Sequence, residues 1–163
     1  MAPRILFQDA IFRGHVSFQN ATFERNVSFR PGTFKEGACF IGTRFKKEAE
    51  FSGATVEHGA VFDAAAFEHD FFPFFPAQVR SGRISFENPV LLKRIRCKRL
   101  RGFLKKIKKP VAETTFTRPN ALEAACRTAK QSCEAMGEKE KADQYFIVKC
   151  QLEGYKNPHF LDF

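Results

Sequence analysis

The side chains that could perform acid–base or metal chemistry are widely spaced in this chain. Its four histidines are His15, His58, His69 and His159, and none lies at metal-ligand spacing from another histidine or from a cysteine. His69 precedes Asp70, which would allow an acid/base pair, but we expect a structural hydrogen bond there. We place His15 and His58 on solvated corners.

The cysteines show no arrangement typical of a disulfide framework or a metal site. They are odd in number and lack a short paired spacing: Cys39, Cys97, Cys126, Cys133 and Cys150. This predicts reduced thiols in a cytoplasmic protein. We expect Cys126, Cys133 and Cys150 to pack as small apolar side chains. With no phosphate-binding glycine loop and no nucleophile elbow, the sequence predicts a protein that is not an enzyme and has no cofactor.

The strongest chemical signal is a run of basic residues in the middle of the chain. Residues 73–119 carry a net charge of +11, whereas residues 1–72 and 120–163 each carry −1. The candidate anion- or partner-binding residues are Lys93, Arg94, Arg96, Lys98, Arg99, Arg101, Lys105, Lys106, Lys108 and Lys109. Their apolar neighbours fit one face of a helix. Such a segment could be a solvated face packed on the fold, or could bind an anionic membrane, nucleic acid or a protein. No nucleic-acid-binding motif accompanies it, which makes nucleic acid the weaker alternative.

A phenylalanine repeat before the basic run must set the frame of the fold. Phenylalanine returns every five, then six, residues from Phe7 to Phe67, with Val56 as the one exception. A small or short-branched residue stands two places before each member from Phe12 onward. Neither a strand nor a helix can hold this rhythm for sixty residues, so the chain must turn a corner about every five residues.

Four such sides close a coil of 22 residues, which stacks on the next coil at the spacing of neighbouring strands. The predicted inward ladders are Phe7/Phe29/Phe51, Phe12/Phe34/Val56, Phe18/Phe40/Phe62 and Phe23/Phe45/Phe67. Stacked rings and the buried apolar area favour this arrangement. The sequence thus predicts a β solenoid of about three coils.

Segments such as Phe18-Gln-Asn-Ala-Thr-Phe23 and Phe51-Ser-Gly-Ala-Thr-Val56 resemble pentapeptide-repeat proteins. The resemblance covers about the first 70 residues and implies a right-handed quadrilateral β-helix. This chain departs from the simplest pattern by adding one residue to every second repeat. Some members of that family resemble duplex DNA, but the near-neutral and short coil of this chain argues against such mimicry.

We expect three regions: the β-helix at 1–72, a Phe/Pro-rich cap with the basic connector at 73–119, and a helical hairpin at 120–157. The segment Phe71-Phe-Pro-Phe-Phe-Pro76 should cover the open end of the last coil, and residues 83–89 could add one degenerate repeat.

The first predicted helix begins at Asn120 as N-cap and ends at Gly137, and the second runs from about Glu138 to Leu152. The first buries a stripe of apolar residues, and the second turns a further set inward. The first set is Leu122, Ala125, Cys126, Ala129, Cys133 and Met136, and the second is Ala142, Tyr145, Phe146 and Cys150. This hairpin is similar to one that follows the repeats in some pentapeptide-repeat proteins, some of which continue into ion-channel-type membrane helices.

These features predict a non-catalytic scaffold that binds a protein partner. The chain enters its repeat without a cap, so the partner could be a second copy at this end, or the sequence could be part of a longer protein. The first alternative is a cytoplasmic accessory domain peripheral to an anionic membrane, taken from an ion-channel-type protein. The second is nucleic-acid binding through the basic segment. We expect no signal peptide and no membrane span.

Overall fold

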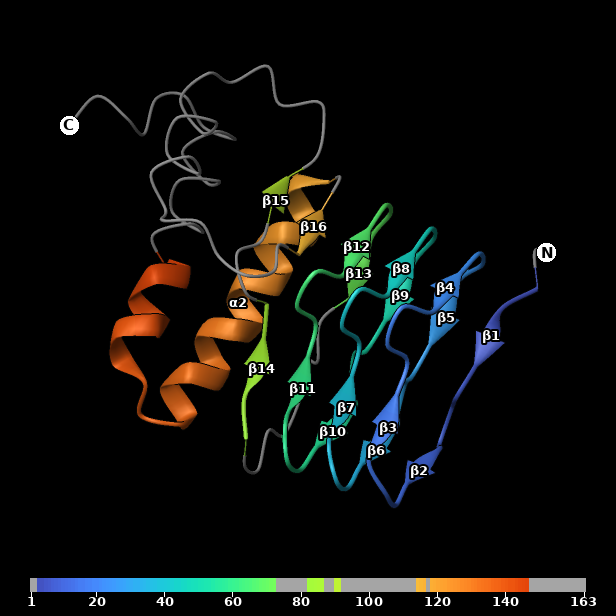
Figure 1. Ribbon diagram of the computed structural model, residues 1–163, viewed down its shortest axis with the longest axis horizontal. Coiled ribbons are helices and arrows are strands. Elements are labelled where there is room, and N and C mark those ends of the chain that lie inside the picture. The colour runs from blue at the N-terminus through green and yellow to red at the C-terminus, as the bar shows by residue number, and fades with distance from the viewer. Residues whose placement is uncertain (1–2, 73–81, 87–89, 92–113, 117, 147–163) are drawn as a thin grey trace.

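The computed structural model describes residues 3–72, 82–86, 90–91, 114–116 and 118–146. Two-residue strands pair in parallel and form four sheets, one for each side of a β solenoid of about three coils (Figure 1). Side A consists of β1 (Ile5–Leu6), β5 (Val27–Ser28), β9 (Ala49–Glu50) and β13 (Phe71–Phe72). Side B consists of β2 (Ile11–Phe12), β6 (Thr33–Phe34) and β10 (Thr55–Val56).

Side C has four strands, like side A, and side D has five. Side C consists of β3 (Val16–Ser17), β7 (Ala38–Cys39), β11 (Ala60–Val61) and β14 (Ile84–Ser85). Side D consists of β4 (Thr22–Phe23), β8 (Arg44–Phe45), β12 (Ala66–Phe67), β16 (Thr115–Phe116) and β15 (Val90–Leu91), in that spatial order. The predicted solenoid is confirmed.

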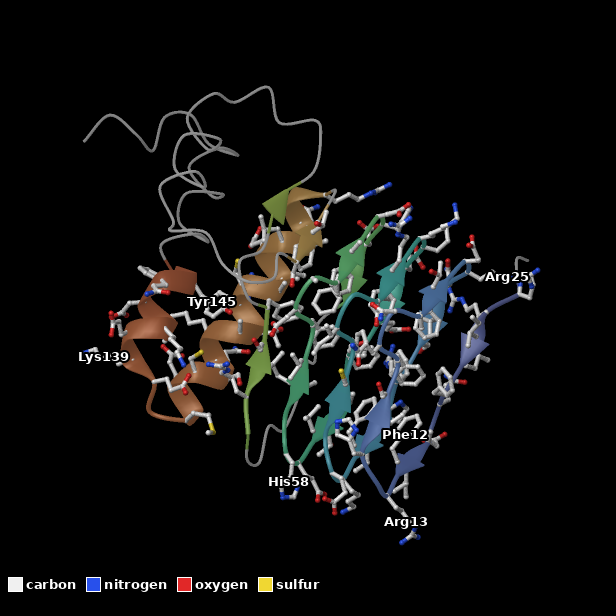
Figure 2. All side chains as sticks on the ribbon, viewed as in Figure 1. Phe12, Arg13, Arg25, His58, Lys139 and Tyr145 are labelled. Atoms are coloured by element: carbon white, nitrogen blue, oxygen red, sulfur yellow. The ribbon has the colours of Figure 1, made fainter. Side chains whose placement is uncertain are left out.

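From β1 to β13, the register of paired strands is the predicted 22 residues. Ile5 pairs with Val27, which pairs with Ala49. Directly stacked rings lie 4.7–5.3 Å apart with interplanar angles of 2–13° in every predicted Phe–Phe step. Rings of neighbouring and of opposite sides meet edge-on or tilted, so phenylalanine fills the interior; Figure 2 labels Phe12, a ring of the first coil. Such offset and edge contacts add to the free energy gained by burial.

The corners explain why five- and six-residue repeats alternate. Pro31 stands two places after the phenylalanine in one five-residue step, and each of the other five steps turns tightly at that place through a residue with positive φ. These residues are Asp9, Asn20, Gly42, Gly53 and Ala64. Glycine, asparagine and aspartate tolerate this left-handed conformation, whereas alanine does so at a cost. The six-residue steps add one residue to the bend, so two corners of each coil are tight and two are wider.

The last coil departs from the simple repeat. Phe71 pairs with Ala49, so a buried phenylalanine occupies the column that Ile5, Val27 and Ala49 fill in earlier coils. Ile84 pairs with Ala60, which confirms one further repeat near residues 83–89. The rest of the Phe/Pro segment, 73–76, lies outside the described residues.

One strand of the last coil comes from much later in the chain. Thr115 and Phe116 pair with Ala66 and Phe67, and the Phe116 ring stacks on Phe67 at 4.7 Å. Thr114 occupies the small-residue column, and its hydroxyl donates to the Phe62 carbonyl at 2.6 Å. The strand that stacks on β12 therefore comes from a segment about two coil lengths later in the sequence.

Helix α2 (Pro119–Ala135) covers the end of the stack opposite β1 (Figure 1). Its N-cap is Arg118, without a side-chain capping bond, so the expectation of an Asn120 cap is wrong. Proline at the first helical position is pre-organised for a helix start, which places the boundary two residues earlier. Gly137 adopts φ 74° and ends the helix as expected. Its amide and that of Glu138 donate to the Glu134 and Cys133 carbonyls, which completes a Schellman motif.

A second helical segment, residues 139–146, completes the predicted hairpin. The hairpin closes the exposed strand edge with hydrogen bonds, because Ser132 Oγ accepts from the Ile84 amide at 2.6 Å and Tyr145 donates to the Phe86 carbonyl at 3.0 Å. Ala142 is buried as expected. Phe146 and Met136 are each 46% exposed, so their predicted burial is wrong. Cys150 and the predicted end near Gly154 lie outside the described residues.

Candidate functional site: side A of the solenoid

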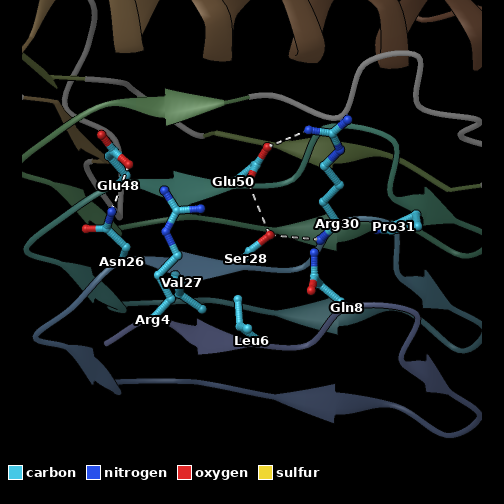
Figure 3. A pocket seen from close by; sticks show the side chains of 10 residues that line it. All are labelled: Arg4, Leu6, Gln8, Asn26, Val27, Ser28, Arg30, Pro31, Glu48 and Glu50. Carbon is cyan, nitrogen blue, oxygen red and sulfur yellow. Dashed lines mark hydrogen bonds and ion pairs between the residues drawn. The ribbon is translucent and has the colours of Figure 1, made fainter. Parts of the chain in front are cut away.

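Because phenylalanine fills the interior, the polar groups of the solenoid lie on its outer sides. Side A carries a shallow groove of about 460 Å³ that crosses the first three coils (Figure 3). The groove is lined by Arg4, Leu6, Gln8, Asn26, Val27, Ser28, Arg30, Pro31, Glu48 and Glu50. The 22-residue stack creates it, since Leu6, Ser28 and Glu50 are successive outward residues on neighbouring strands.

Hydrogen bonds order the side chains of the groove. Glu50 accepts from Ser28 Oγ and from Arg30, each at 3.2 Å. Asn26 donates its amide to Glu48 Oε2 at 2.8 Å. The groove therefore presents two arginines, two glutamates and Leu6, which is 54% exposed. This mixture suits a polypeptide surface, whereas the two carboxylates oppose a polyanion.

The groove continues into a cluster at the corner between sides D and A. Asp70 stands one coil after Glu48, and the Ala49 amide donates to the Asp70 carbonyl at 3.0 Å. One ligand atom from each of Glu48, His69 and Asp70 lies within 4.8 Å of the others, and all three residues are half-buried. Arg118 reaches the same corner because β16 stacks on β12. It contacts Asp70 Oδ1 at 3.5 Å and His69 Nε2 at 3.2 Å. Among the described residues, Glu48, His69 and Asp70 are the group that could hold a metal ion.

The two thiols of α2 offer little reactivity. Cys126 and Cys133 are buried on α2, and burial raises the pKa of Cys126 to about 12. Burial also raises the pKa of Cys133. Because the thiolate is the reactive form, both residues remain protonated packing groups at neutral pH. Cys39 is half-buried on side C.

The ten candidate basic residues from Lys93 to Lys109 lie outside the described residues. The strands on either side of them are described, however. β15 (Val90–Leu91) pairs directly with β16 (Thr115–Phe116) on side D. The basic segment therefore leaves side D and returns to it at neighbouring strands. Within the described part of the chain, no helix is long and apolar enough to cross a bilayer.

His15 and His58 are exposed, as expected; Figure 2 shows His58 at an outer corner. Sequence reasoning paired His69 with Asp70 and missed Glu48 and Arg118. Glu48 could have been found from the repeat, because 48 and 70 differ by one coil. Arg118 could not, because its position depends on the late strand β16.

A parallel β solenoid with a filled phenylalanine core defines the structural class. The family model of pentapeptide repeats in 9 copies matches residues 7–55, which confirms the resemblance for this part of the chain. Comparison with curated proteins and with solved structures found no match for the chain.

Proposed function

We propose that this protein is a non-catalytic repeat scaffold that binds another protein through the groove on side A. The observation that supports this proposal best is the composition of the groove. It combines both charge signs, amide groups and one exposed leucine on a rigid surface. The partner is a polypeptide segment that offers complementary groups, since nucleic acid or anionic lipid would meet the charges of Glu48 and Glu50.

The rigidity of the solenoid contributes to this function. Side chains of the groove stand on strands whose inward neighbours, such as Val27 and Phe29, are 2% and 0% exposed. Binding therefore orders few groups that are not already ordered, which lowers the entropic cost of association. Repeat scaffolds of this type present extended preformed surfaces to their partners.

The test is site-specific photo-crosslinking in the cells that express the protein. Gln8 and Gln19 form a matched pair, because each is exposed and follows a phenylalanine of the first coil, on sides A and C respectively. A crosslinker at Gln8 should capture a defined polypeptide that a crosslinker at Gln19 does not capture. The double variant Arg4→Glu/Arg30→Glu should reduce that adduct at least tenfold. Equal adducts from the two positions, or none from Gln8, would contradict the proposal.

We propose as a second candidate that the basic segment holds the protein at an anionic membrane surface. Ten basic residues stand within residues 93–109. The pairing of β15 with β16 supports the proposal, since it attaches both ends of the segment to the solenoid. Each lysine or arginine near such a surface contributes about 1 kcal/mol. The similarity of the hairpin to those of ion-channel-type proteins extends this proposal to an accessory domain of a longer membrane protein.

Co-sedimentation with anionic and neutral vesicles across a salt series tests this second candidate. Changing Lys105, Lys106, Lys108 and Lys109 to serine should abolish salt-sensitive binding to anionic vesicles. A control with the same charge change at Lys35, Lys46, Lys47 and Lys139 should bind as the wild type does. Equal losses in both variants would show a non-specific charge effect. Binding of RNA in preference to the vesicles would favour nucleic acid instead.

A further inference from the structure

The solenoid brings three potential metal ligands together at the corner between sides D and A. Glu48 precedes β9, and His69 and Asp70 precede β13 on the next coil. Their positions are fixed by the stacked backbone, where the Val27 and Ala49 amides donate to the Glu48 and Asp70 carbonyls at 2.9 and 3.0 Å. No other group of three histidine, cysteine or acidic side chains within the described ranges is arranged closely enough to hold a metal ion.

A neighbouring side chain contacts one oxygen of each carboxylate. Asn26 donates to Glu48 Oε2 at 2.8 Å, and Arg118 contacts Asp70 Oδ1 at 3.5 Å. One oxygen of each carboxylate is therefore held by a neighbour, and the other is available to a ligand. A neutral outer partner such as Asn26 fixes ligand orientation in metal sites, and its loss weakens metal affinity by roughly 10–100-fold.

His69 supplies an independent observation that points to a ligand. Its Nδ1 atom is buried and has no hydrogen-bond partner among the residues the structure describes. It lies 3.5 Å from Asp70 Oδ2. A buried polar nitrogen without a partner is uncommon and calls for an explanation, of which an ion is one.

We propose that Glu48, His69 and Asp70 form a binding site for a divalent transition-metal ion, of which Zn²⁺ fits best. One imidazole and two carboxylates are ligands that Zn²⁺ accepts, whereas Mg²⁺ and Ca²⁺ prefer oxygen alone. Ligand atoms bound to one zinc ion lie about 3–3.5 Å apart, given metal–ligand distances of roughly 2.0–2.2 Å. The ligand atoms of the three residues lie within 4.8 Å of one another. Side-chain rotations that bring these atoms closer by roughly 1–2 Å would reach the spacing of a zinc site.

Arg118 competes with the metal ion. Because a guanidinium group only donates hydrogen bonds, its contact with Nε2 places the proton of the neutral imidazole on Nδ1. A metal ion on Nδ1 displaces that proton, and the ring then carries its proton on Nε2, which no longer accepts from Arg118. Arg118 is 49% exposed, so it can turn into solvent. The ion replaces its charge beside the two carboxylates.

Calorimetric titration of the full chain with Zn²⁺, and with Mg²⁺ as a control, tests this site. The wild type should bind one Zn²⁺ ion, and His69→Gln should weaken binding at least tenfold. The matched control His58→Gln removes an exposed histidine of the same solenoid and should bind as the wild type does. Arg118→Gln should bind Zn²⁺ several-fold more tightly, because it removes the competing cation.

Unfolding curves of the metal-free variants separate a lost site from a lost fold. His69→Gln and Arg118→Gln should unfold within a few degrees of the wild type, and Zn²⁺ should raise the wild-type midpoint but not that of His69→Gln. Unchanged affinity in His69→Gln, equal losses in His58→Gln, weaker binding in Arg118→Gln, or no binding by the wild type would each overturn the proposal.

Discussion

Truncation of a ladder phenylalanine should cost more in the middle of the stack than at its end. Phe40 is 0% exposed, and its ring stacks on both Phe62 and Phe18, at 4.7 and 5.2 Å. Phe18 belongs to the first coil, is only half-buried, and has a stacked ring on one side. The two variants therefore make the same substitution in one column of rings, at Phe40 with two stacked neighbours and at Phe18 with one.

Phe40→Ala should destabilise the protein by about 4 kcal/mol, the typical cost of removing a fully buried phenylalanine. Phe18→Ala should cost about 2 kcal/mol, because one stacking contact worth roughly 0.5–1.5 kcal/mol and part of the buried area are already absent. Phe40→Asp should not fold at all, since a buried carboxylate there would have no partner.

Urea unfolding followed by circular dichroism measures these differences. Since the total stability of a small domain is about 5–15 kcal/mol, Phe40→Ala should lower the midpoint far more than Phe18→Ala. Equal midpoints for the two variants, or a larger loss for Phe18→Ala, would refute the idea that stacked rings along the axis hold the solenoid together. A cooperative transition near that of the wild type for Phe40→Asp would refute it as well.

Three further predictions concern a corner, a helix contact and a thiol. Ala64→Gly should stabilise the protein by about 0.5–1 kcal/mol, because Ala64 holds φ at 57° and glycine adopts this conformation freely; thermal unfolding measures the gain. Tyr145→Phe should cost about 1 kcal/mol in urea unfolding through the lost bond to the Phe86 carbonyl. Burial raises the pKa of Cys126 from 9.0 to about 12, so its contribution to stability is complete below pH 9 and is lost as the pH rises toward 12. Cys126→Ala should therefore flatten the stability profile over that range, measured by urea unfolding at each pH.

Much of the solenoid could be predicted because the same short pattern of inward residues recurs at every step of the repeat. From β1 to β13, the 22-residue period gives the partner of each strand without any knowledge of the rest of the chain, as the pairing of Val27 with Ile5 and Ala49 shows. Most tight corners were equally local, since aspartate, asparagine or glycine, which tolerate positive φ, stands two places after Phe7, Phe18, Phe40 and Phe51.

The end of the solenoid could not be predicted in the same way. Phe116 stacks on Phe67 at a sequence distance of 49, and no fixed period indicates where an interrupted repeat resumes. Residues Thr114-Thr-Phe116 match the inward pattern, but one triplet is too short to be distinguished from chance. The exposure of Met136 and Phe146 has a related cause, because helical spacing identifies a face but the neighbouring elements decide how much of that face is covered.

The candidate site could be predicted only in part. Glu48 and Asp70 could be aligned from the coil length alone, whereas their contact with Arg118 depends on the late strand β16. The repeat also predicts that Leu6, Ser28 and Glu50 form one outward column on side A. The sequence does not indicate, however, that this side is a better binding surface than the other three. The positions of the side chains show that the groove lies on side A.

The groove and the group of Glu48, His69 and Asp70 both depend on the 22-residue stack. One engineered disulfide tests that register directly. Ser17 pairs with the native Cys39 across β3 and β7, and neighbouring strands place the two Cα atoms about 4.8 Å apart. This separation lies within the range of roughly 4.4–6.8 Å that disulfides accept. Ser17→Cys should form an intramolecular disulfide with Cys39 on mild oxidation, identified by mass spectrometry of the joined peptides, and Gln19→Cys, two residues out of register, should not. Failure of Ser17→Cys to join Cys39, or equal joining by Gln19→Cys, would contradict the stack.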